Sequence, residues 1–385
     1  MSYTIDVYKR RCRVETNLLH YALFVSFFPT LINGPIERYP QMRPQIQKSR
    51  RFSYGRCAGG AFRMLWGYTK KMVLADNLSH YVSLVYGDVG SMSGPNLVAA
   101  TVLFAVQLYM DFSGCCDIAL GAARILGYDL IENFQSPFEA RTFNDFWRRW
   151  HISMTSWFRD YVYIPLGGSR CRLRRTCLNL LIVFALTGLW HGAAWQYVVF
   201  GLLHGIILCM ERLGLRRALE QLPRLFRHLY TVVLLWLTLV IFGAPGLPEG
   251  LAVLKGVFTW QSGAKGYTLA AFADNKLLLI LAASFLLCGP VQALCPKLKA
   301  ALYAKKAPSP AGMAGLLVLL FLGLMRVTAG TYSAFIIFNF KGGAEPCVKR
   351  SKLALSACSA PSSGWRSRCS TFFPSSCRWT VTKTA

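Results

Sequence analysis

One histidine, His191, stands in an apolar stretch, residues 178–210, that contains no Asp, Glu, Lys or Arg. Ionisable side chains in such stretches are costly to keep in a membrane, and they commonly carry function. A neutral imidazole can take the proton from a hydroxyl group as that hydroxyl attacks a thioester carbonyl. The alternative is a structural histidine that hydrogen-bonds between two helices. The residue type and its surroundings make His191 the first candidate for a general base.

A second histidine, His151, lies in a stretch rich in aromatic and basic side chains, residues 141–168. Thr142, with an acidic residue three positions later, fits a capping box, so we predict a helix from near Phe143 to just before Pro165. The mixture of Trp and Arg in this helix is typical of the headgroup boundary, which predicts an interfacial helix. From these residues alone, an interfacial histidine explains His151 as well as a functional one does.

The remaining titratable residues of the apolar stretches give weaker signals. On a continuous helix, His204 would point to nearly the opposite side from His191, so it is not predicted to be its partner. Asp111 and Asp117 are too far apart in sequence to form a carboxylate dyad on one helix face, and we predict that they pair with basic side chains or backbone inside a bundle. The spacing of His, Cys, Asp and Glu predicts no metal site, and no Walker loop or dinucleotide fingerprint is present.

The elements that must position these residues are membrane helices. The 385 residues are 54% hydrophobic and only 16% charged, which is too little polar surface for a soluble protein. Uncharged windows long enough to be candidate spans occur at 16–36, 89–110, 178–210, 228–248, 277–296, 307–325 and 327–340, with weaker candidates at 57–86 and 112–126. The sequence therefore predicts an all-α fold, a polytopic transmembrane helical bundle with roughly seven to ten membrane segments plus interfacial helices.

The window 178–210 is long enough for one tilted helix or for two broken ones. Four glycines interrupt it, at positions 188, 192, 201 and 205. Irregular backbone at membrane depth is tolerated only where it lines a cavity or is buried in protein. We therefore expect a break in this window, either lining a cavity or buried in protein.

The net charge of +26, from 43 Lys and Arg against 17 Asp and Glu, is concentrated in loops between the apolar windows. Basic loops are typical of the cytoplasmic side of a membrane protein, so loops 38–51, 141–175, 212–227 and 297–306 are predicted to be cytoplasmic. The charge is thus explained by membrane lipid and not by nucleic acid. The thirteen cysteines are mostly single residues in apolar runs, which predicts free thiols and no disulfide framework.

Several motifs resemble one known family, the membrane-bound O-acyltransferases, and within it the bacterial branch of the alginate O-acetylation membrane protein and the teichoic acid D-alanyl transfer protein. The motifs are Asn33-Gly-Pro-Ile-Glu-Arg-Tyr39, Met110-Asp-Phe-Ser-Gly114, Asp117-Ile-Ala-Leu-Gly121, Glu132-Asn-Phe-Gln-Ser-Pro137, Phe146-Trp-Arg-Arg-Trp-His-Ile-Ser153, Trp157-Phe-Arg-Asp-Tyr161, Tyr163-Ile-Pro-Leu-Gly-Gly168 and Thr187-Gly-Leu-Trp-His-Gly-Ala193. The resemblance covers residues 1–340, which are predicted to form one membrane-bound O-acyltransferase domain. Family members carry further helices ahead of the region that matches Met1, so the resemblance implies that this chain lacks N-terminal helices.

The last residues, 341–385, have a different character. They are basic, rich in Ser and Cys, and without apolar periodicity, which predicts a disordered tail. They look like out-of-frame sequence and match nothing in the family pattern.

The resemblance also implies roles for individual residues. The histidine of the Trp-His-Gly motif, which corresponds to His191, is taken as catalytic in this family, and the histidine of the Trp-His-x-Ser motif corresponds to His151. The candidate substrate-binding residues are Asp117, Trp147, Arg148 and Trp190 within the shared motifs, and Asn144 just ahead of the motif that begins at Phe146. Arg148 and its basic neighbours are expected to attract an anionic donor such as the phosphates of coenzyme A.

The implied activity is transfer of an acyl group, acetyl above all, from a cytoplasmic thioester toward an exported polysaccharide or a periplasmic partner protein, as in alginate O-acetylation. The resemblance places such a multi-pass enzyme in the bacterial inner membrane, with acetyl-CoA as co-substrate and no bound cofactor. Two alternatives remain open. One is a proton-coupled transporter in which His191 and interior aspartates form a relay, and the other is an inactive truncated remnant.

Overall fold

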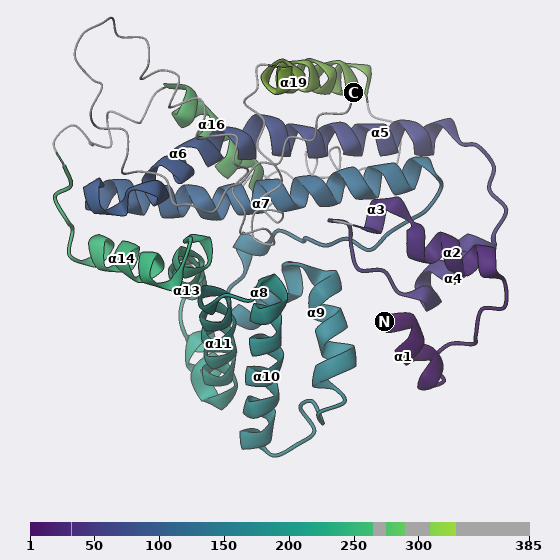
Figure 1. Ribbon diagram of the computed structural model, residues 1–385, viewed down its shortest axis with the longest axis horizontal. Helices are drawn as coiled ribbons and strands as arrows, with labels where there is room; N and C mark the ends of the chain where they lie inside the picture. The colour runs from purple at the N-terminus through teal and green to yellow at the C-terminus, as the bar shows by residue number, and fades with distance from the viewer. Residues whose placement is uncertain (32, 265–274, 289–308, 329–385) are drawn as a thin grey trace, which may run out of the picture. The chain divides into compact units, whose positions relative to one another are not determined.

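The computed structural model describes residues 1–31, 33–264, 275–288 and 309–328, all of which belong to one unit, Met1–Lys341. A second unit, Gly342–Ala385, lies outside the described residues, as does the whole predicted tail. The described residues are helical and contain no β-strand (Figure 1). This confirms the predicted all-α fold.

Four of the described helices are long and apolar enough to cross a membrane. They are α7 (Gly94–Ile125), α10 (Leu173–His191), the helix Trp195–Gln221 and α13 (Arg224–Gly243). The third comprises α11 (Trp195–Met210), the π-helix η5 (Glu211–Leu215) and α12 (Arg216–Gln221). A helical membrane protein is thereby confirmed, whereas the total of seven to ten segments stays a prediction because windows 277–296 and 327–340 extend beyond the described residues.

Shorter helices complete the described part of the chain. They are α1 (Ser2–Tyr8), α2 (Leu18–Ser26), α3 (Phe28–Leu31), α4 (Tyr39–Gln47), α14 (Leu247–Phe258), α16 (Asn275–Cys288) and α19 (Pro310–Thr328), with 3-10 turns at Val89–Ser91 and Pro137–Glu139. The predicted window 16–36 is divided between α2 and α3, because Phe27, between them, has extended backbone.

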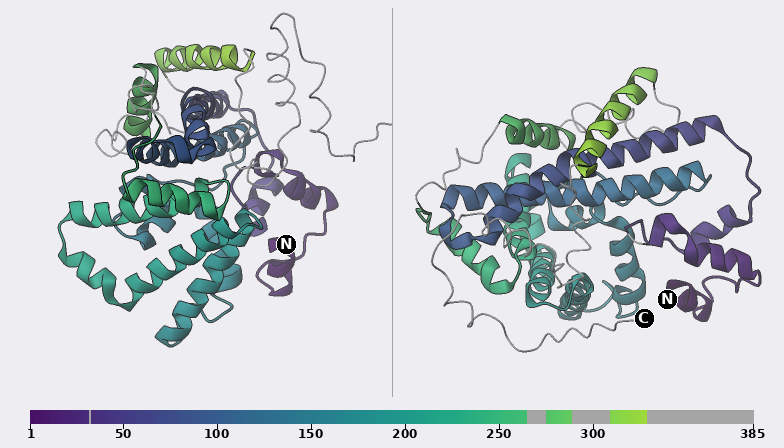
Figure 2. Two further views of the ribbon diagram at one scale, coloured as in Figure 1. Left: turned by 60° about the vertical axis from the view of Figure 1, so that its left-hand side comes forward. Right: turned by 45° about the horizontal axis from the view of Figure 1, so that its top comes forward.

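The longest helix, α7, lies beside the helical run formed by α5 (Tyr54–Tyr68), the π-helix η1 (Thr69–Ala75) and α6 (Asp76–Gly87) (Figures 1 and 2). Windows 89–110 and 112–126 were predicted as separate segments, and this was wrong, since α7 spans both without a break. Asp111 divides the two windows and Asp117 lies within the second, and the neighbouring run neutralises both, so the helix can continue through them. Five residues form this buried charge cluster: Arg63, Lys70, Lys71, Asp111 and Asp117.

Within the cluster, Asp117 contacts Arg63 and Lys70, each with a nitrogen–oxygen distance of 2.6 Å. Asp111 contacts Lys71 at 3.2 Å. The prediction that the two aspartates pair inside the bundle is therefore confirmed. A charge that is buried among helices needs such a partner, because its desolvation costs several kcal/mol.

The window 178–210 is broken, as predicted. α10 ends at His191, and α11 begins at Trp195 after a short turn. The two helices then pack along their length as a hairpin. A Cβ atom built on Gly201 would lie 2.2 Å from the carbonyl oxygen of Phe184, and one on Gly188 would lie 2.3 Å from that of Tyr197. The two glycines thus allow the backbones of α10 and α11 to touch.

The predicted helix from Phe143 begins as expected, since the Thr142 hydroxyl accepts a hydrogen bond from the Asp145 amide at 3.0 Å. The helical run also ends just before Pro165, as predicted, but it is interrupted at Trp150 and His151. It is divided into α8 (Phe143–Arg149), α9 (Ile152–Phe158) and the π-helix η4 (Arg159–Tyr163). The continuous helix was a wrong prediction, because residues 133–135 pair with the backbone at 149–152 and hold it out of helical geometry.

Candidate active site

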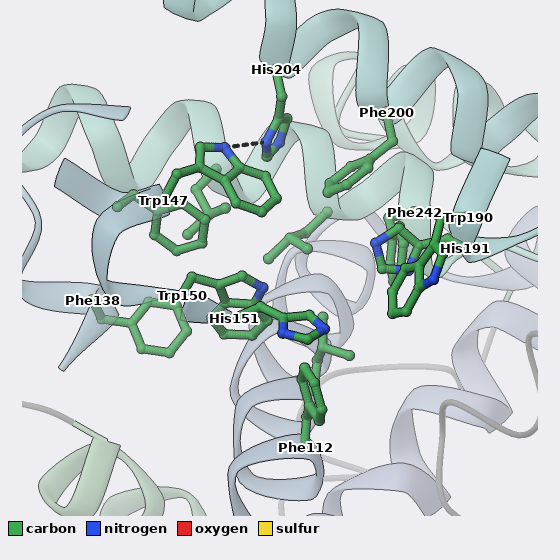
Figure 3. A pocket seen from close by; sticks show the side chains of 14 residues that line it. Phe112, Phe138, Trp147, Trp150, His151, Trp190, His191, Phe200, His204 and Phe242 are labelled. Atoms are coloured by element: carbon green, nitrogen blue, oxygen red, sulfur yellow. Dashed lines mark hydrogen bonds between the residues drawn. The ribbon is translucent and has the colours of Figure 1, made fainter. Parts of the chain in front are cut away.

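Three histidines reach one cavity from three different segments (Figure 3). We call this cavity the histidine pocket, and its volume is about 60 Å³. Apart from the imidazoles, its wall is apolar and mostly aromatic. The lining residues are Leu108, Phe112, Phe138, Phe146, Trp147, Trp150, His151, Trp190, His191, Phe200, His204, Leu235, Leu239 and Phe242.

His191 is the last residue of α10 and is partly exposed. Its ring is held edge to face against Phe242 and Trp190, each with a centroid distance of 5.0 Å. The sequence places it there because α10 ends immediately before Gly192, so the imidazole stands at the mouth of the turn between two helices. The imidazole thus stands at the predicted break of window 178–210, and it lines a cavity.

His151 is the residue at which the backbone turns from α8 into α9. Its φ of 46° is left-handed, a conformation that is uncommon for a non-glycine residue and that marks a constrained site. The constraint is the pairing between the two segments: the Gln135 amide donates to the Arg149 carbonyl and the Ile152 amide to the Asn133 carbonyl, both at 3.0 Å. The pairing turns the imidazole of His151 into the pocket.

The two ring nitrogens of His151 differ. Nδ1 lies 3.3 Å from Oδ1 of Asn133. Nε2 is buried, and none of the described residues offers it a hydrogen-bond partner. Burial, and to a smaller extent the neighbouring His191, lowers the pKa of His151 to about 3, so the ring is neutral near pH 7.

His204 was predicted to point away from His191, and the structure corrects this, since it lines the same pocket. The prediction assumed one continuous helix, whereas the turn after His191 reverses the chain. Both nitrogens of His204 are engaged: Nδ1 accepts from the Trp147 indole N–H at 3.2 Å, and Nε2 lies 2.7 Å from the Thr238 hydroxyl oxygen. An indole N–H can only donate, so Nδ1 is an acceptor and Nε2 carries the proton.

Of the predicted substrate-binding residues, only Trp147 and Trp190 line the histidine pocket. Trp190 packs against both catalytic candidates, with centroid distances of 5.6 Å to His151 and 5.0 Å to His191. Asp117 instead belongs to the buried charge cluster and lines another, polar cavity of about 200 Å³.

Asn144 and Arg148 lie in a third cavity, which we call the basic pocket, with a volume of about 380 Å³. Its arginines are Arg148, Arg159, Arg212 and Arg216. Glu211 also lines it, but this carboxylate is occupied in capping α8, since it accepts from the backbone amides of Phe143 and Asn144 at 2.6 and 3.1 Å. Arg159 and Arg216 are paired with Asp160 and Glu220, so the positive charge of the basic pocket comes from Arg148 and Arg212.

Trp147 lines both the histidine pocket and the basic pocket, so its indole is the wall between them. That wall is fixed by the hydrogen bond to His204. An anionic group in the basic pocket would lie on one side of Trp147, and the histidines on the other.

Sequence reasoning missed two residues of the site, His204 and Asn133. His204 carried a usable signal, because the predicted break in window 178–210 removes the argument for opposite faces. Asn133 stands in a quoted motif, Glu132 to Pro137, but nothing in that motif indicates that its side chain meets His151. Across the described ranges, no group of three or more His, Cys, Asp or Glu side chains has an arrangement that could hold a metal ion.

Comparison with known proteins bears on the site as a whole. The profile of the membrane-bound O-acyltransferase family matches residues 9–245. The chain is similar to the peptidoglycan O-acetyltransferase of Helicobacter pylori, with 34% identity over 84% of this chain and 65% of the relative. It is also similar to the probable alginate O-acetylase AlgI of Pseudomonas aeruginosa, with 37% identity over 68% of this chain and 50% of the relative.

A more distant relative is the teichoic acid D-alanyltransferase of Bacillus subtilis, with 30% identity over 48% of this chain and 49% of the relative. The chain thus spans between about half and two thirds of the length of these relatives.

Proposed function

Because the chain belongs to the membrane-bound O-acyltransferase family, we propose that it transfers an acetyl group from a cytoplasmic thioester such as acetyl-CoA to a hydroxyl group. The acceptor is an exported polysaccharide or a periplasmic partner, and the site is the bacterial inner membrane. The observation that carries this proposal is the histidine pocket, which brings His191 and His151 together inside an apolar wall. Two of the relatives are named for O-acetyl transfer, on peptidoglycan and on alginate.

In the proposed reaction, the hydroxyl oxygen of the acceptor attacks the acyl carbon of the thioester. The new carbon–oxygen bond forms as the carbon–sulfur bond breaks. His191 takes the proton from the hydroxyl and returns it to the departing thiolate, which is general base and then general acid catalysis. His151 orients the attacking group, and the apolar wall excludes water that would otherwise hydrolyse the thioester.

The size of the histidine pocket supports a short acyl group. Its volume of about 60 Å³ is well below the roughly 150 Å³ of a cavity that accepts benzene. A two-carbon acyl group suits such a space, whereas a long chain would need Trp147 or its neighbours to move.

The basic pocket supports an anionic donor. Arg148 and Arg212 are suited to phosphate groups such as those of coenzyme A. Because Trp147 lines both pockets, a donor held by these arginines would lie against the wall of the histidine pocket. Loops 141–175 and 212–227, which supply these arginines, are the ones predicted to face the cytoplasm.

The transporter alternative receives less support. A proton relay would need interior carboxylates in line with His191, but Asp111 and Asp117 are held by Lys71 and by the Arg63–Lys70 pair in the buried charge cluster. Neither aspartate lines the histidine pocket.

The test is acetyl transfer by the purified full chain in lipid vesicles, with radiolabelled acetyl-CoA and O-deacetylated polysaccharide as acceptor. We expect His191→Ala to lower the rate by at least about 100-fold, the lower range for loss of a general base. His80→Ala is the matched control, since His80 is exposed and lies outside the pocket. Equal rates for the two variants would refute the role of His191, and a wild-type chain that transfers no acyl group would refute the proposed function.

A further inference from the structure

The Asn133 side chain contacts His151 at Nδ1, the ring nitrogen that does not face the histidine pocket. Oδ1 of Asn133 lies 3.3 Å from Nδ1 of His151, 3.0 Å from the Ser153 amide nitrogen and 2.8 Å from the Ser153 hydroxyl oxygen. The Ser153 amide can only donate, so the amide atom that faces it must be the oxygen and not the nitrogen. The other end agrees, because Nδ2 lies 3.4 Å from the Cys116 sulfur, a weak acceptor.

This orientation of the amide determines where His151 carries its proton. A carbonyl oxygen only accepts, so Nδ1 of the neutral ring must be the protonated nitrogen. Nε2 then keeps its lone pair. It is buried, and the described residues offer it no partner, while the ring lines the histidine pocket between Phe112 and Trp190 (Figure 3).

We propose that Asn133 is a positioning residue that holds His151 with its proton on Nδ1, so that Nε2 accepts a hydrogen bond from the acceptor hydroxyl group. This rests on the proposed acyl transfer and narrows it. A bare Nε2 cannot donate to the thioester carbonyl, so His151 does not polarise the acyl donor. In the bound acceptor, Nε2 of His151 holds the single O–H of the hydroxyl. This O–H then turns to His191, the base, which takes the proton as the oxygen attacks.

The surroundings of His151 suit this division of work. The titratable group that faces it across the pocket is His191 of α10, and the rings of Phe112 and Trp190 pack edge to face against the imidazole. Behind Asn133 lies Cys116 of α7. Asn133 is itself 1% exposed, so water does not compete for its oxygen.

His204 provides the contrast within the same pocket. Its Nδ1 is occupied by Trp147 and its Nε2 by Thr238, so it has no nitrogen to offer a substrate. Of the two buried histidines, only His151 presents an acceptor nitrogen to the cavity. It does so because the side-chain amide of Asn133 binds its other nitrogen.

The first test is a double-mutant cycle in the acetyl-transfer assay. Asn133→Leu lets the ring of His151 change tautomer or rotate, and we expect kcat to fall on the order of 100-fold, as for a reacting group misplaced by about 1 Å. His151→Gln should cost about as much. If Asn133 acts through His151, the double variant is no slower than the slower of the two single variants. Each single variant then already removes the same contribution to kcat, that of a correctly oriented His151.

Additive losses, in contrast, would show that Asn133 serves folding alone and would overturn the proposal. Asn179→Leu is the matched control, since Asn179 is also a buried amide, bonded to the Leu166 and Gly168 carbonyls away from the pocket. Its loss should lower thermal stability and combine additively with His151→Gln.

The second test does not depend on activity. Nitrogen-15 spectra of histidine-labelled protein distinguish a protonated ring nitrogen from a bare one, and the signals of His151 are identified by their loss in His151→Gln. We expect a protonated Nδ1 and a bare Nε2, and a change of tautomer in Asn133→Leu. The reverse assignment in the wild-type chain would overturn the proposal even if the chain transfers no acyl group, so the two failures can be told apart.

Discussion

At the scale of single residues, the histidines of the pocket differ in what their ring nitrogens are bonded to. A neutral imidazole has one donor and one acceptor, and each protein contact uses up one of them. Both ring nitrogens of His204 are hydrogen-bonded, one to Trp147 and the other to Thr238. These bonds hold Trp147 in place between the two pockets. In His151 only the donor nitrogen, Nδ1, is bonded, to Asn133. The acceptor nitrogen, Nε2, has no hydrogen-bond partner among the described residues. The hydrogen-bond partners of each histidine, and not the residue type, therefore determine what its ring can do in the pocket.

The low pKa of His151 predicts a pH dependence of stability. The folded chain keeps His151 neutral down to about pH 3, whereas an unfolded chain protonates its histidines near pH 6.5. Between these values the unfolded state binds more protons, so the free energy of unfolding falls as the pH falls. The stability contributed by this residue is complete above about pH 6.5 and declines below it, by at most about 1.4 kcal/mol for each pH unit.

The measurement is the thermal unfolding temperature in detergent at pH 7 and pH 5, for the wild-type chain and for His151→Gln. We expect a larger drop in the wild type, because Gln does not titrate. The other histidines are present in both proteins and cancel in the comparison. The same drop in both would mean that His151 is protonated in the folded chain.

At the scale of elements, the site depends on places where helices stop. α10 ends at His191, and α8 gives way to α9 at His151, so each catalytic candidate stands at a helix boundary. The first boundary is closed by a helix hairpin and the second by the backbone pairing with residues 133–135. The backbone pairing satisfies the Arg149 carbonyl and the Ile152 amide, which a broken helix would otherwise leave unpaired.

The hairpin predicts a strict size limit at Gly201. Gly201→Val would place side-chain carbon against the Phe184 carbonyl, where even a Cβ atom would lie only 2.2 Å away. The helices must then separate, which costs about 1–3 kcal/mol and displaces His191 and His204 relative to each other. We expect lower thermal stability together with lost acetyl transfer.

The control is Gly87→Ala, since a Cβ atom there meets nothing within 4 Å. If Gly201→Val had the same thermal stability and the same acetyl-transfer rate as this control, the tight hairpin would be excluded.

At the scale of the whole molecule, the described helices are joined by buried charge as well as by apolar packing. The cluster around Asp117 connects α5 and η1 to α7, and its members are at most 3% exposed. Asp117 was predicted to bind substrate, and no comparison tests that role. Its position among Arg63 and Lys70 favours a contribution to folding.

Asp117→Asn tests this role. It leaves two buried cations with one negative partner fewer, so we expect destabilisation of about 3–5 kcal/mol. Asp129→Asn removes the exposed pair with Arg56 and should cost at most about 1 kcal/mol. Thermal unfolding and the KM for acetyl-CoA are measured on all three proteins. A raised KM with unchanged unfolding temperature in Asp117→Asn would instead support the substrate-binding prediction.

The membrane class, the helical fold and the break in window 178–210 could be predicted from the sequence alone, and the same sequence made His191 the first candidate for the base. These follow from composition, from uncharged windows and from a lone titratable group in an apolar stretch, all of which are local properties. The family motifs added His151. The cap at Thr142 and the pairing of the interior aspartates were also readable, because a polar group in such a setting must find a partner.

Which polar groups meet could be read only from the folded chain. His204 joins the pocket because the chain reverses after His191, α8 and α9 separate because a distant segment pairs with the backbone between them, and α7 runs on because α5 and η1 neutralise its aspartates. Asn133 meets His151 by the same pairing. Each of these contacts joins residues far apart along the chain, and hydrophobic periodicity carries no information about such pairs. The direction of one amide, and with it the tautomer of His151, follows from the folded structure alone.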